Sequence, residues 1–374
     1  MKQWLNSTTV RSRNHLCESG SLARLGSRLA ALAGNAAALH QPLPPASEGH
    51  IAAIEAALGA RLVARYMSVP DRTCSIFNWP RALQMAVELG LTPLIGLGGG
   101  SPIGLAKAVS SALEEQRTGR PARAAFPTEQ PLIPVIAIPT TYAGSEMTPI
   151  YGVTHHADGS TRKITVRDAK IAPKLVIYDP TLTLNLPPAL TAGTGINALA
   201  HCVEAVYSIT RNPFSSAAAL SGIQYINWAL PLCYRQGDDL PARTDMLLGA
   251  HLAGTSLASV AMGLHHGLCH VLGGSAGVAH GVANAIILPH AMRFNLDACA
   301  PQLAQVAQAM GVTMPTQSDK SKAEAAIQAV ERLIGQWGCP SSLREAGVAE
   351  AIYLVWLNWP SKAAPCSRSQ ASHR

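Results

Sequence analysis

Apolar residues follow two different patterns along the chain, and the pattern changes near residue 190. Between residues 93 and 180 the apolar runs are short, continuous and rich in Val, Ile and Leu, which is typical of buried strands. The segment 93–115 predicts a strand, a tight glycine turn and a helix, and two more strands are predicted at 133–141 and 174–180. After Leu190 the strand pattern fades and helical character takes over. The predicted helices cover 191–208, 214–230, 241–262, 264–275, 280–295, 301–311 and 321–337.

The order of these elements predicts the fold class. Strands alternating with helices and followed only by helices indicate an α/β N-terminal nucleotide-binding domain plus an all-α C-terminal domain. We expect the first domain to cover 1–188, the helical catalytic domain to cover 189–350, and 351–374 to form an atypical tail. The cleft between the two domains is the natural place for a ligand.

Residues 1–90 do not fit this scheme well. Ala and Leu give helical character to 21–34 and 50–62, and a short β-like run covers 61–69. No strong Val/Ile strand is found before residue 93, although an α/β domain should open with one. We therefore expect an incomplete sheet in which 1–90 is atypical.

Composition and charge narrow the class of protein. Hydrophobic residues make up 48% of the chain and charged residues 14%, which excludes disorder for most of it. The formal net charge is +7, but the Lys and Arg residues form no dense run, so nucleic acid is disfavoured and a small anionic ligand is favoured. The 8 Cys include no C-x-x-C pair, and the N-terminus has no apolar run of the signal-peptide kind. We expect reduced, buried thiols and a cytoplasmic protein.

Residues 246–292 contain no Asp, Glu, Lys or Arg, and the stretch is long enough to span a membrane. It also carries six His and many Gly, and polar groups at that density are costly in lipid. We interpret it as a buried core segment that carries a site, and expect no membrane association.

Two turns carry the first candidate chemistry. The glycine turn after residue 97 joins a strand to a helix, where backbone N–H groups can approach a phosphate. A second turn, 139–146, follows the next strand and suits another cofactor contact, since ligands sit at the carboxyl ends of parallel strands. Each turn could also have a structural role alone: the first as a tight connection between strand and helix, and the second as the capped start of a helix. The candidate cofactor residues in them are Gly98, Gly99, Gly100, Ser101, Thr140, Thr141 and Ser145.

Four histidines on three of the predicted helices form the second candidate site. Asn197 and His201 are four residues apart, so they share one helix face, and His266 and His270 repeat this spacing. His280 opens the next predicted helix. Three imidazoles and one oxygen suit a divalent ion such as Fe or Zn, but the neutral amide of Asn197 is a poor ligand compared with a carboxylate. Without metal, the same imidazoles could donate protons or hydrogen bonds to an anionic substrate. We assign His265 and His290 to structure.

The motifs together resemble a known family. GGGSPIGLAK, PTTYAGSEMT, the Asn197/His201 helix and HHGLCH…AHGVANAIILPH are similar to the iron-containing (group III) alcohol dehydrogenases over about residues 92–349. The resemblance implies the dehydroquinate synthase-like architecture of a dinucleotide-binding and a helical domain. Gly104, PTTYAGSE and Asn197 depart from typical alcohol dehydrogenases toward the maleylacetate reductases, which reduce maleylacetate to 3-oxoadipate in the degradation of aromatic compounds. Gly267, where that branch usually has Lys, points back to the alcohol dehydrogenases.

The resemblance also implies residue roles and partners. NADH or NADPH would bind with its pyrophosphate at Gly98–Ser101, and Lys163 would reach the nicotinamide ribose region. A metal is not expected to be required, and if one is bound its ligands would be Asn197, His201, His266 and His280. The same three histidines would hold a small dicarboxylate, and His270 is the expected acid, with His266 as the other proton source. The family also implies a homodimer.

Two other functions remain open. One is a metal (Fe/Zn)-dependent alcohol dehydrogenase, and the other is an inactive binding protein with a defective cofactor domain. The second arises because 1–90 matches the family only in patches and 351–374 departs in the same way. Compensating frameshifts in the coding sequence, which we favour, or genuine divergence would each explain that pattern.

Overall fold

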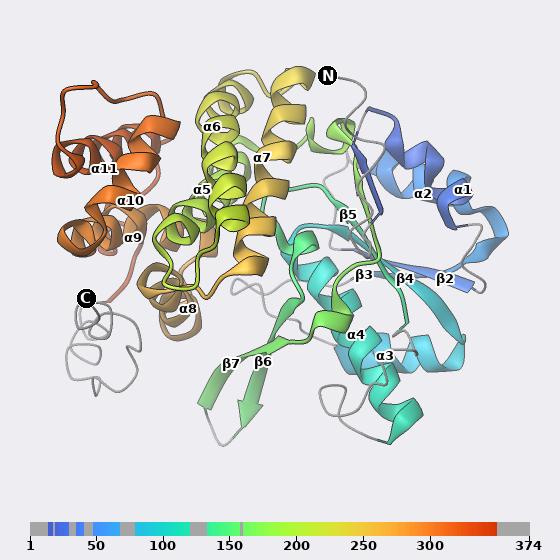
Figure 1. Ribbon diagram of the computed structural model, residues 1–374. Coiled ribbons are helices and arrows are strands. Elements are labelled where there is room, and N and C mark those ends of the chain that lie inside the picture. Colours follow the sequence, from blue (N-terminus) through green and yellow to red (C-terminus); the bar gives the residue numbers. More distant parts are fainter. Residues whose placement is uncertain are drawn as a thin grey trace.

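The computed structural model describes residues 14–17, 19–29, 35–40, 48–67, 79–119, 133–157 and 160–349. A half built on a parallel sheet lies beside a half built only of helices (Figure 1). Segment 351–374, where we expect an atypical tail, lies outside the described residues.

The first half is a six-stranded parallel sheet with the strand order β1-β8-β5-β4-β2-β3. The strands are β1 Asn14–Cys17, β2 Asn35–His40, β3 Leu62–Met67, β4 Leu91–Gly98, β5 Val135–Pro139 and β8 Leu175–Tyr178. The strands predicted from the apolar runs at 61–69, 93–98, 133–141 and 174–180 are all present. All six strands run the same way, so their carboxyl ends meet at one edge of the sheet.

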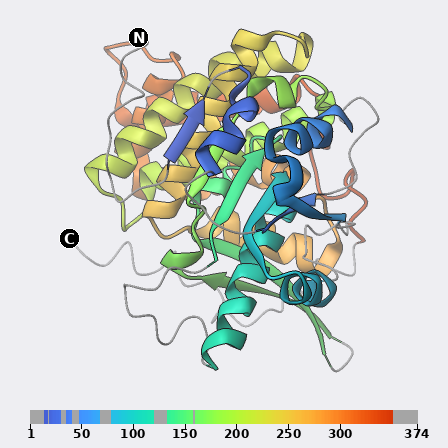
Figure 2. The ribbon, with the colours of Figure 1, turned by 90° about the vertical axis from the view of Figure 1, so that its right-hand side faces the viewer.

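Helices cover both faces of this sheet, as Figures 1 and 2 show. One face packs against α1 Leu25–Leu29 and α2 Glu48–Leu58, and the other against α3 Trp79–Glu88 and α4 Gly100–Thr118. Ile95 and Leu97 of β4 face the first pair, while Leu94 faces the second. The alternation explains why this strand is apolar on both sides.

The expectation of an incomplete sheet is wrong. Three of the six strands, β1, β2 and β3, come from residues 1–90. The strand β2 has the sequence NAAALH, and its residues 36–39 are fully buried between β3 and β4. Alanine has no strand preference of its own, so the pairing with two neighbours and the closely packed helices decide the conformation of this segment.

A two-stranded antiparallel hairpin, β6 Ile150–Ala157 and β7 Ser160–Arg167, extends from the sheet half beneath the helical half (Figure 1). We did not predict it. Short 3-10 turns within the described residues include η2 Ser21–Arg24, η4 Gly59–Arg61, η5 Ser145–Met147, η6 Ala169–Ile171 and η7 Pro180–Thr183.

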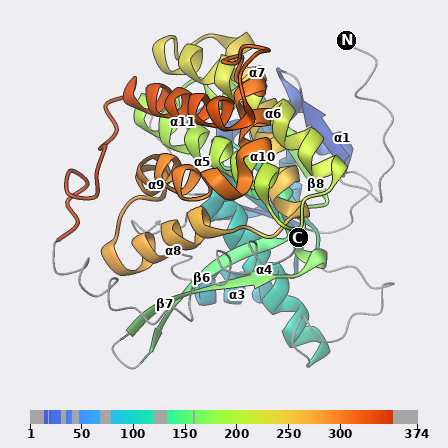
Figure 3. The ribbon, with the colours of Figure 1, turned by 60° about the vertical axis from the view of Figure 1, so that its left-hand side comes forward.

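The second half is helical, as predicted, and Figure 3 shows it from its outer side. Its helices are α5 Pro188–Tyr207, α6 Pro213–Arg235, α7 Leu240–Ser259, α8 Leu264–Ala276, α9 His280–Phe294, α10 Leu296–Ala309 and α11 Asp319–Gly335. The N-cap side chains of Asn212, Asp239 and Ser318 accept backbone N–H groups and begin three of them. α5 is the centre of the half, with most of its residues buried.

Within the described residues, no single helix is long and apolar enough to cross a membrane, and α7 with residues Leu264–Gly274 of α8 passes that test only as a pair bent by 100°. Five cysteines, Cys202, Cys233, Cys269, Cys299 and Cys339, are free thiols, and all but Cys339 are buried. This agrees with the expected reduced thiols.

Replacing Gly96 with Ala should destabilise the protein, because β4 and α4 touch at this residue. An added Cβ would lie 2.8 Å from the Ile103 Cα and 3.1 Å from the Pro102 carbonyl oxygen, both of them backbone atoms. We expect a loss of roughly 1–3 kcal/mol in the free energy of unfolding, measured by urea denaturation. Gly274→Ala is the control, since nothing lies within 4 Å of its added Cβ. A Gly96→Ala protein as stable as the parent would contradict the close contact.

Candidate active site

The glycine turn between β4 and α4 has the form of a phosphate cradle. Gly98 has a φ of 131°, which favours glycine, and α4 begins directly after it. A Cβ on Gly99 would lie 3.2 Å from the Thr141 Oγ1. The Ser101 side chain is only 5% exposed, and its Oγ has no hydrogen-bond partner among the residues that the structure describes. A buried hydroxyl without a partner at the N-terminus of a 19-residue helix is suited to bind an anion.

The second turn lies directly beside the first. Gly98 and Pro139 are neighbours in the sheet, and the Thr140 N–H donates to the Gly98 carbonyl at 3.0 Å. Thr140 and Thr141 are both buried, and the place of a Cβ on Gly100 is 3.7 Å from the Ser145 Cβ. The structure thus brings together all seven predicted cofactor residues of the two turns.

Lys107 fixes the second turn from the sheet side. The side chain is fully buried in α4, and its Nζ donates to the carbonyls of Ser145 at 2.7 Å, Thr148 at 2.8 Å and Ile150 at 3.0 Å. The Lys107 ammonium group therefore binds the protein backbone, and three carbonyl oxygens take the place of the water molecules that would solvate it.

The helical half fixes the same turn from the other side. The Tyr142 hydroxyl accepts a hydrogen bond of 2.8 Å from the buried Arg243, and the Asn197 Nδ2 donates to the Ala143 carbonyl at 3.4 Å. Gly144 has a φ of +72° and lies against Gly254 of α7, where an added Cβ would be 2.5 Å from the Gly144 oxygen. Three consecutive residues of the turn, 142–144, therefore each contact a different residue of the helical half.

Glu146 lies behind this turn and is almost completely buried. The Tyr178 hydroxyl donates to its carboxylate at 2.9 Å, and the His251 Nδ1 lies 3.3 Å from the same hydroxyl. Burial raises the pKa of Glu146 to about 7, although the hydrogen bonds and Lys107 act in the opposite direction. The carboxyl is thus protonated in much of the protein near neutral pH.

The four predicted histidines fall into two pairs. His201 of α5 and His266 of α8 are 4% and 6% exposed, and their rings stack with centroids 4.6 Å apart. His270 of α8 is exposed, and its ring centroid lies 6.0 Å from that of His280 at the start of α9. Burial first, and the neighbouring imidazoles next, hold the pKa of His201 well below its ordinary value. His201 is therefore neutral and can act through hydrogen bonds only.

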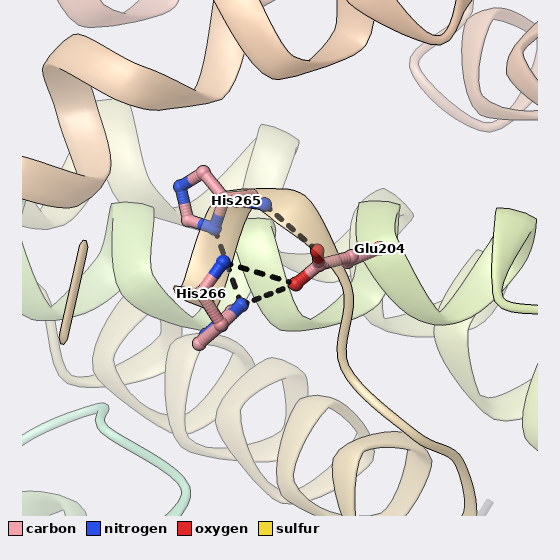
Figure 4. Close-up of side chains that lie close together, drawn as sticks. All are labelled: Glu204, His265 and His266. Carbon is pink, nitrogen blue, oxygen red and sulfur yellow. Dashed lines mark hydrogen bonds and ion pairs between the residues drawn. The ribbon is translucent and has the colours of Figure 1, made fainter. Parts of the chain in front are cut away.

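Glu204 joins this cluster and was not among the predicted residues. Its Oε1 accepts from the Gly263 N–H at 2.9 Å and the His265 N–H at 3.0 Å, so the carboxylate caps the N-terminus of α8. Its Oε2 accepts from the His266 Nδ1 at 2.5 Å (Figure 4). Burial is the largest influence and would raise the pKa of Glu204, but the hydrogen bonds from His266 and the Gly263 N–H and the charges of the nearby imidazoles together outweigh it, and the pKa lies below its ordinary value.

A sequence signal for Glu204 was present. It follows Asn197 by seven residues and His201 by three, so the three side chains share one face of α5. It is also the only charged residue of that predicted helix, 191–208. The i, i+4 histidine spacing that predicted the other members of the site does not include this carboxylate.

His265, which we assigned to structure, is fully buried beside this pair. Its Nε2 lies 3.3 Å from the Asn284 carbonyl oxygen, and its Nδ1 lies 3.2 Å from the His266 Nδ1. Burial lowers the pKa of His265 to about 3, so its ring is neutral. His290 is exposed on α9.

The predicted metal ligands do not fit a shared ion in this arrangement. The rings of His201 and His266 are within 19° of parallel, and an imidazole lone pair lies in its ring plane, so the two cannot point at one ion. Among the described residues, His201, His266 and His280 do not bring three ligand atoms within 4.8 Å of one another. The fourth position, Asn197, carries no charge to balance a divalent cation.

The three ligand atoms that do lie within 4.8 Å of one another belong to Glu204, His265 and His266. Their separations of 2.5 Å and 3.2 Å are hydrogen-bonding distances. Two ligands at about 2.1 Å from a tetrahedral ion would be roughly 3.4 Å apart. We therefore describe this group as a hydrogen-bonded network.

Lys163 lies in β7 opposite Thr154. Its side chain is outside the part of the chain that the structure describes, so its predicted contact with the nicotinamide ribose region stays a prediction.

Comparison with known proteins identifies the family. Residues 12–180 match the family described as iron-containing alcohol dehydrogenase, and residues 191–359 match the Fe-containing alcohol dehydrogenase family, C-terminal. A maleylacetate reductase of Sphingobium indicum is 34% identical over 344 residues, which are 91% of this chain and 88% of that protein. The chain belongs to the iron-containing alcohol dehydrogenase family. The predicted α/β plus all-α architecture is thereby confirmed.

Other members of the family are similar over different lengths. A maleylacetate reductase of Burkholderia cepacia is 43% identical over 228 residues, and the match spans 61% of this chain and 58% of that protein. The crystal structure of maleylacetate reductase from Rhizobium sp. has a TM-score of 0.76 at 32% identity, covering 98% of this chain and 92% of that one. A 1,3-propanediol oxidoreductase has a TM-score of 0.80 at 29% identity, covering 91% and 89%.

Replacing Glu146 with Gln should change how stability depends on pH. The folded-state pKa of about 7 lies above the ordinary value of 4.5, so the folded protein retains a proton that the unfolded chain releases. Stability should therefore fall as pH rises from about 4.5 to 7, by at most about 3 kcal/mol, and Glu146→Gln should lack this fall. Urea unfolding at pH 5 and pH 8 measures it.

Glu331→Gln is the matched control for that experiment, because Glu331 is 38% exposed and pairs with Arg293 on the surface. A parent protein and a Glu146→Gln protein with the same pH dependence would show that the buried carboxyl ionises at its ordinary pKa.

Proposed function

We propose that the protein is an NADH- or NADPH-dependent reductase of a small unsaturated dicarboxylate, maleylacetate, which it converts to 3-oxoadipate without a metal ion. The observation that carries the proposal is the position of Asn197. Its amide binds the carbonyl of Ala143 in the cofactor turn, and it stands where metal-dependent relatives carry a charged ligand. The identity to maleylacetate reductases supports the same substrate.

When bound, the nicotinamide supplies the hydride. The chain's own residues hold the two turns, present the Ser101 hydroxyl and the α4 N-terminus to the pyrophosphate, and place a substrate between the turns and the histidines. Hydride addition to the substrate double bond leaves an enolate, and one proton completes the reduction. His270 is exposed and next to His280, so we assign it the proton donation.

The assay for this proposal follows the absorbance of NADH or NADPH in the presence of maleylacetate, with and without a chelator. We expect oxidation of the cofactor at the same rate in both conditions. Loss of activity with the chelator, restored by Fe or Zn, would favour the metal-dependent alcohol dehydrogenase instead. Gly267 and the sequence HGVANAIILPHAMRFN, which resembles the alcohol dehydrogenases, are the features that favour that second function.

The third function, an inactive binding protein, is supported less by the structure than by the sequence. Its basis was a defective cofactor domain, yet the sheet has six strands and the two turns are adjacent. A folded protein that fails to quench or enhance NADH fluorescence would favour it. A cytoplasmic homodimer remains part of our proposal, and sedimentation of the purified protein tests its oligomeric state.

Replacing His270 with Ala should reduce the turnover number by at least about 100-fold, because general acid catalysis contributes that much. The side chain is exposed, so the melting temperature should change little. His290→Ala is the matched control, since His290 is an exposed histidine of the next helix. Near-normal turnover of His270→Ala would remove His270 from the mechanism and leave His266 as the proton source.

A further inference from the structure

We propose that Glu204 acts as a positioning residue that holds His266 with a proton on Nδ1, so that Nε2 is the ring nitrogen left for a ligand. The inference deepens the proposed function and rests on it for its catalytic consequence. The position of this proton is a property of the protein alone.

Glu204 is the group that requires this placement of the proton. Its carboxylate can only accept hydrogen bonds, and its Oε2 lies 2.5 Å from the His266 Nδ1, so the hydrogen must be on Nδ1. The carboxylate cannot rotate away, because its other oxygen accepts from the backbone N–H groups of Gly263 and His265. The N-terminus of α8 thus holds Glu204, and Glu204 holds His266.

His265 is compatible with the same placement of the proton. Its Nε2 faces the carbonyl oxygen of Asn284 at 3.3 Å and lies 3.6 Å from the Cys269 Sγ. With its own proton on Nε2 and donated to that carbonyl, His265 presents Nδ1 as an acceptor, 3.2 Å from the His266 Nδ1. The hydrogen on the His266 Nδ1 is then directed at Glu204, and His265 places no competing hydrogen beside it.

The consequence appears on the other edge of the His266 ring. With Nδ1 bound to Glu204, Nε2 is the ring nitrogen left for a ligand, and within the part of the chain that the structure describes it is buried without a hydrogen-bond partner. A buried polar nitrogen without a partner is costly, so a ligand that hydrogen-bonds to it would be favoured there. The position of this nitrogen is therefore set by Glu204.

The test is ¹⁵N nuclear magnetic resonance of the full chain labelled at histidine rings, at pH 8 and with chelator present. Two-bond ¹H–¹⁵N correlations distinguish the two tautomers, and a His266→Gln sample identifies the His266 signals. We expect the pattern of the Nδ1–H tautomer in the unsubstituted protein. The pattern of the Nε2–H tautomer would overturn the proposal, whether or not any variant folds.

Glu204→Gln is the matched variant. With the amide oxygen kept on the two backbone N–H groups, the amide NH₂ faces the His266 Nδ1 and favours the Nε2–H tautomer. We expect the signals to change to that pattern, and the turnover number with maleylacetate to fall about 10–100-fold while the dissociation constant of NADH stays within about twofold. Unchanged His266 signals in folded Glu204→Gln protein would overturn the proposal. Glu331→Gln, the surface control, should change neither measurement.

Different results would contradict the proposed function and the proposed role of Glu204. If the unsubstituted protein shows the Nδ1–H tautomer but does not oxidise NADH with maleylacetate, the proposed substrate is wrong and the positioning of His266 stands. If it reduces maleylacetate but shows the Nε2–H tautomer, the function stands and the positioning role of Glu204 is wrong.

Discussion

The turn after β5 contacts both halves of the molecule, and the packing of one half against the other depends on it. From the sheet half, the buried Lys107 binds the carbonyl of Ser145 at the end of the turn and those of Thr148 and Ile150 just beyond it. From the helical half, Arg243 binds Tyr142, Asn197 binds Ala143, and Gly254 leaves room for the backbone of Gly144. A turn held from both sides has one conformation, and this conformation sets the distance between the cofactor edge of the sheet and the histidines. The site is therefore a product of the packing between the halves.

Buried charged side chains in this protein hold segments of the backbone in position through hydrogen bonds. Charged residues are scarce, at 14% of the chain, yet Lys107, Arg243 and Glu204 are almost completely buried. Each binds backbone groups: carbonyls for the two cations, and the N–H groups at the start of α8 for Glu204. A buried ion without such partners would be strongly destabilising, so each of the three also requires its segment of backbone to stay where it is. The same requirement that stabilises the fold thus orients the cofactor turn and His266.

The stacked imidazoles show how a family site can be kept while its chemistry changes. The resemblance places His201, His266 and His280 at the positions of metal ligands, but in this chain the rings of the first two are nearly parallel and the fourth position, Asn197, is an amide. Burial holds the pKa of His201 well below its ordinary value, so this ring offers hydrogen bonds in place of positive charge. An anionic substrate then depends for its charge neutralisation on groups outside this cluster.

The sequence by itself determined the elements whose signals are local. Continuous apolar runs predicted β4, β5 and β8, glycines and hydroxyls after two strands predicted the cofactor turns, and periodicity predicted α5 to α11 within a few residues, because each signal depends on neighbours along the chain. Only the tertiary structure decided the rest. The alanine-rich β2 became a strand because two strands and two helix layers enclose it, and Lys107 became a backbone anchor because the second turn folds over it. Glu204 gained its partners from α8, about sixty residues away, so its role depends on a contact that no local pattern of the sequence contains.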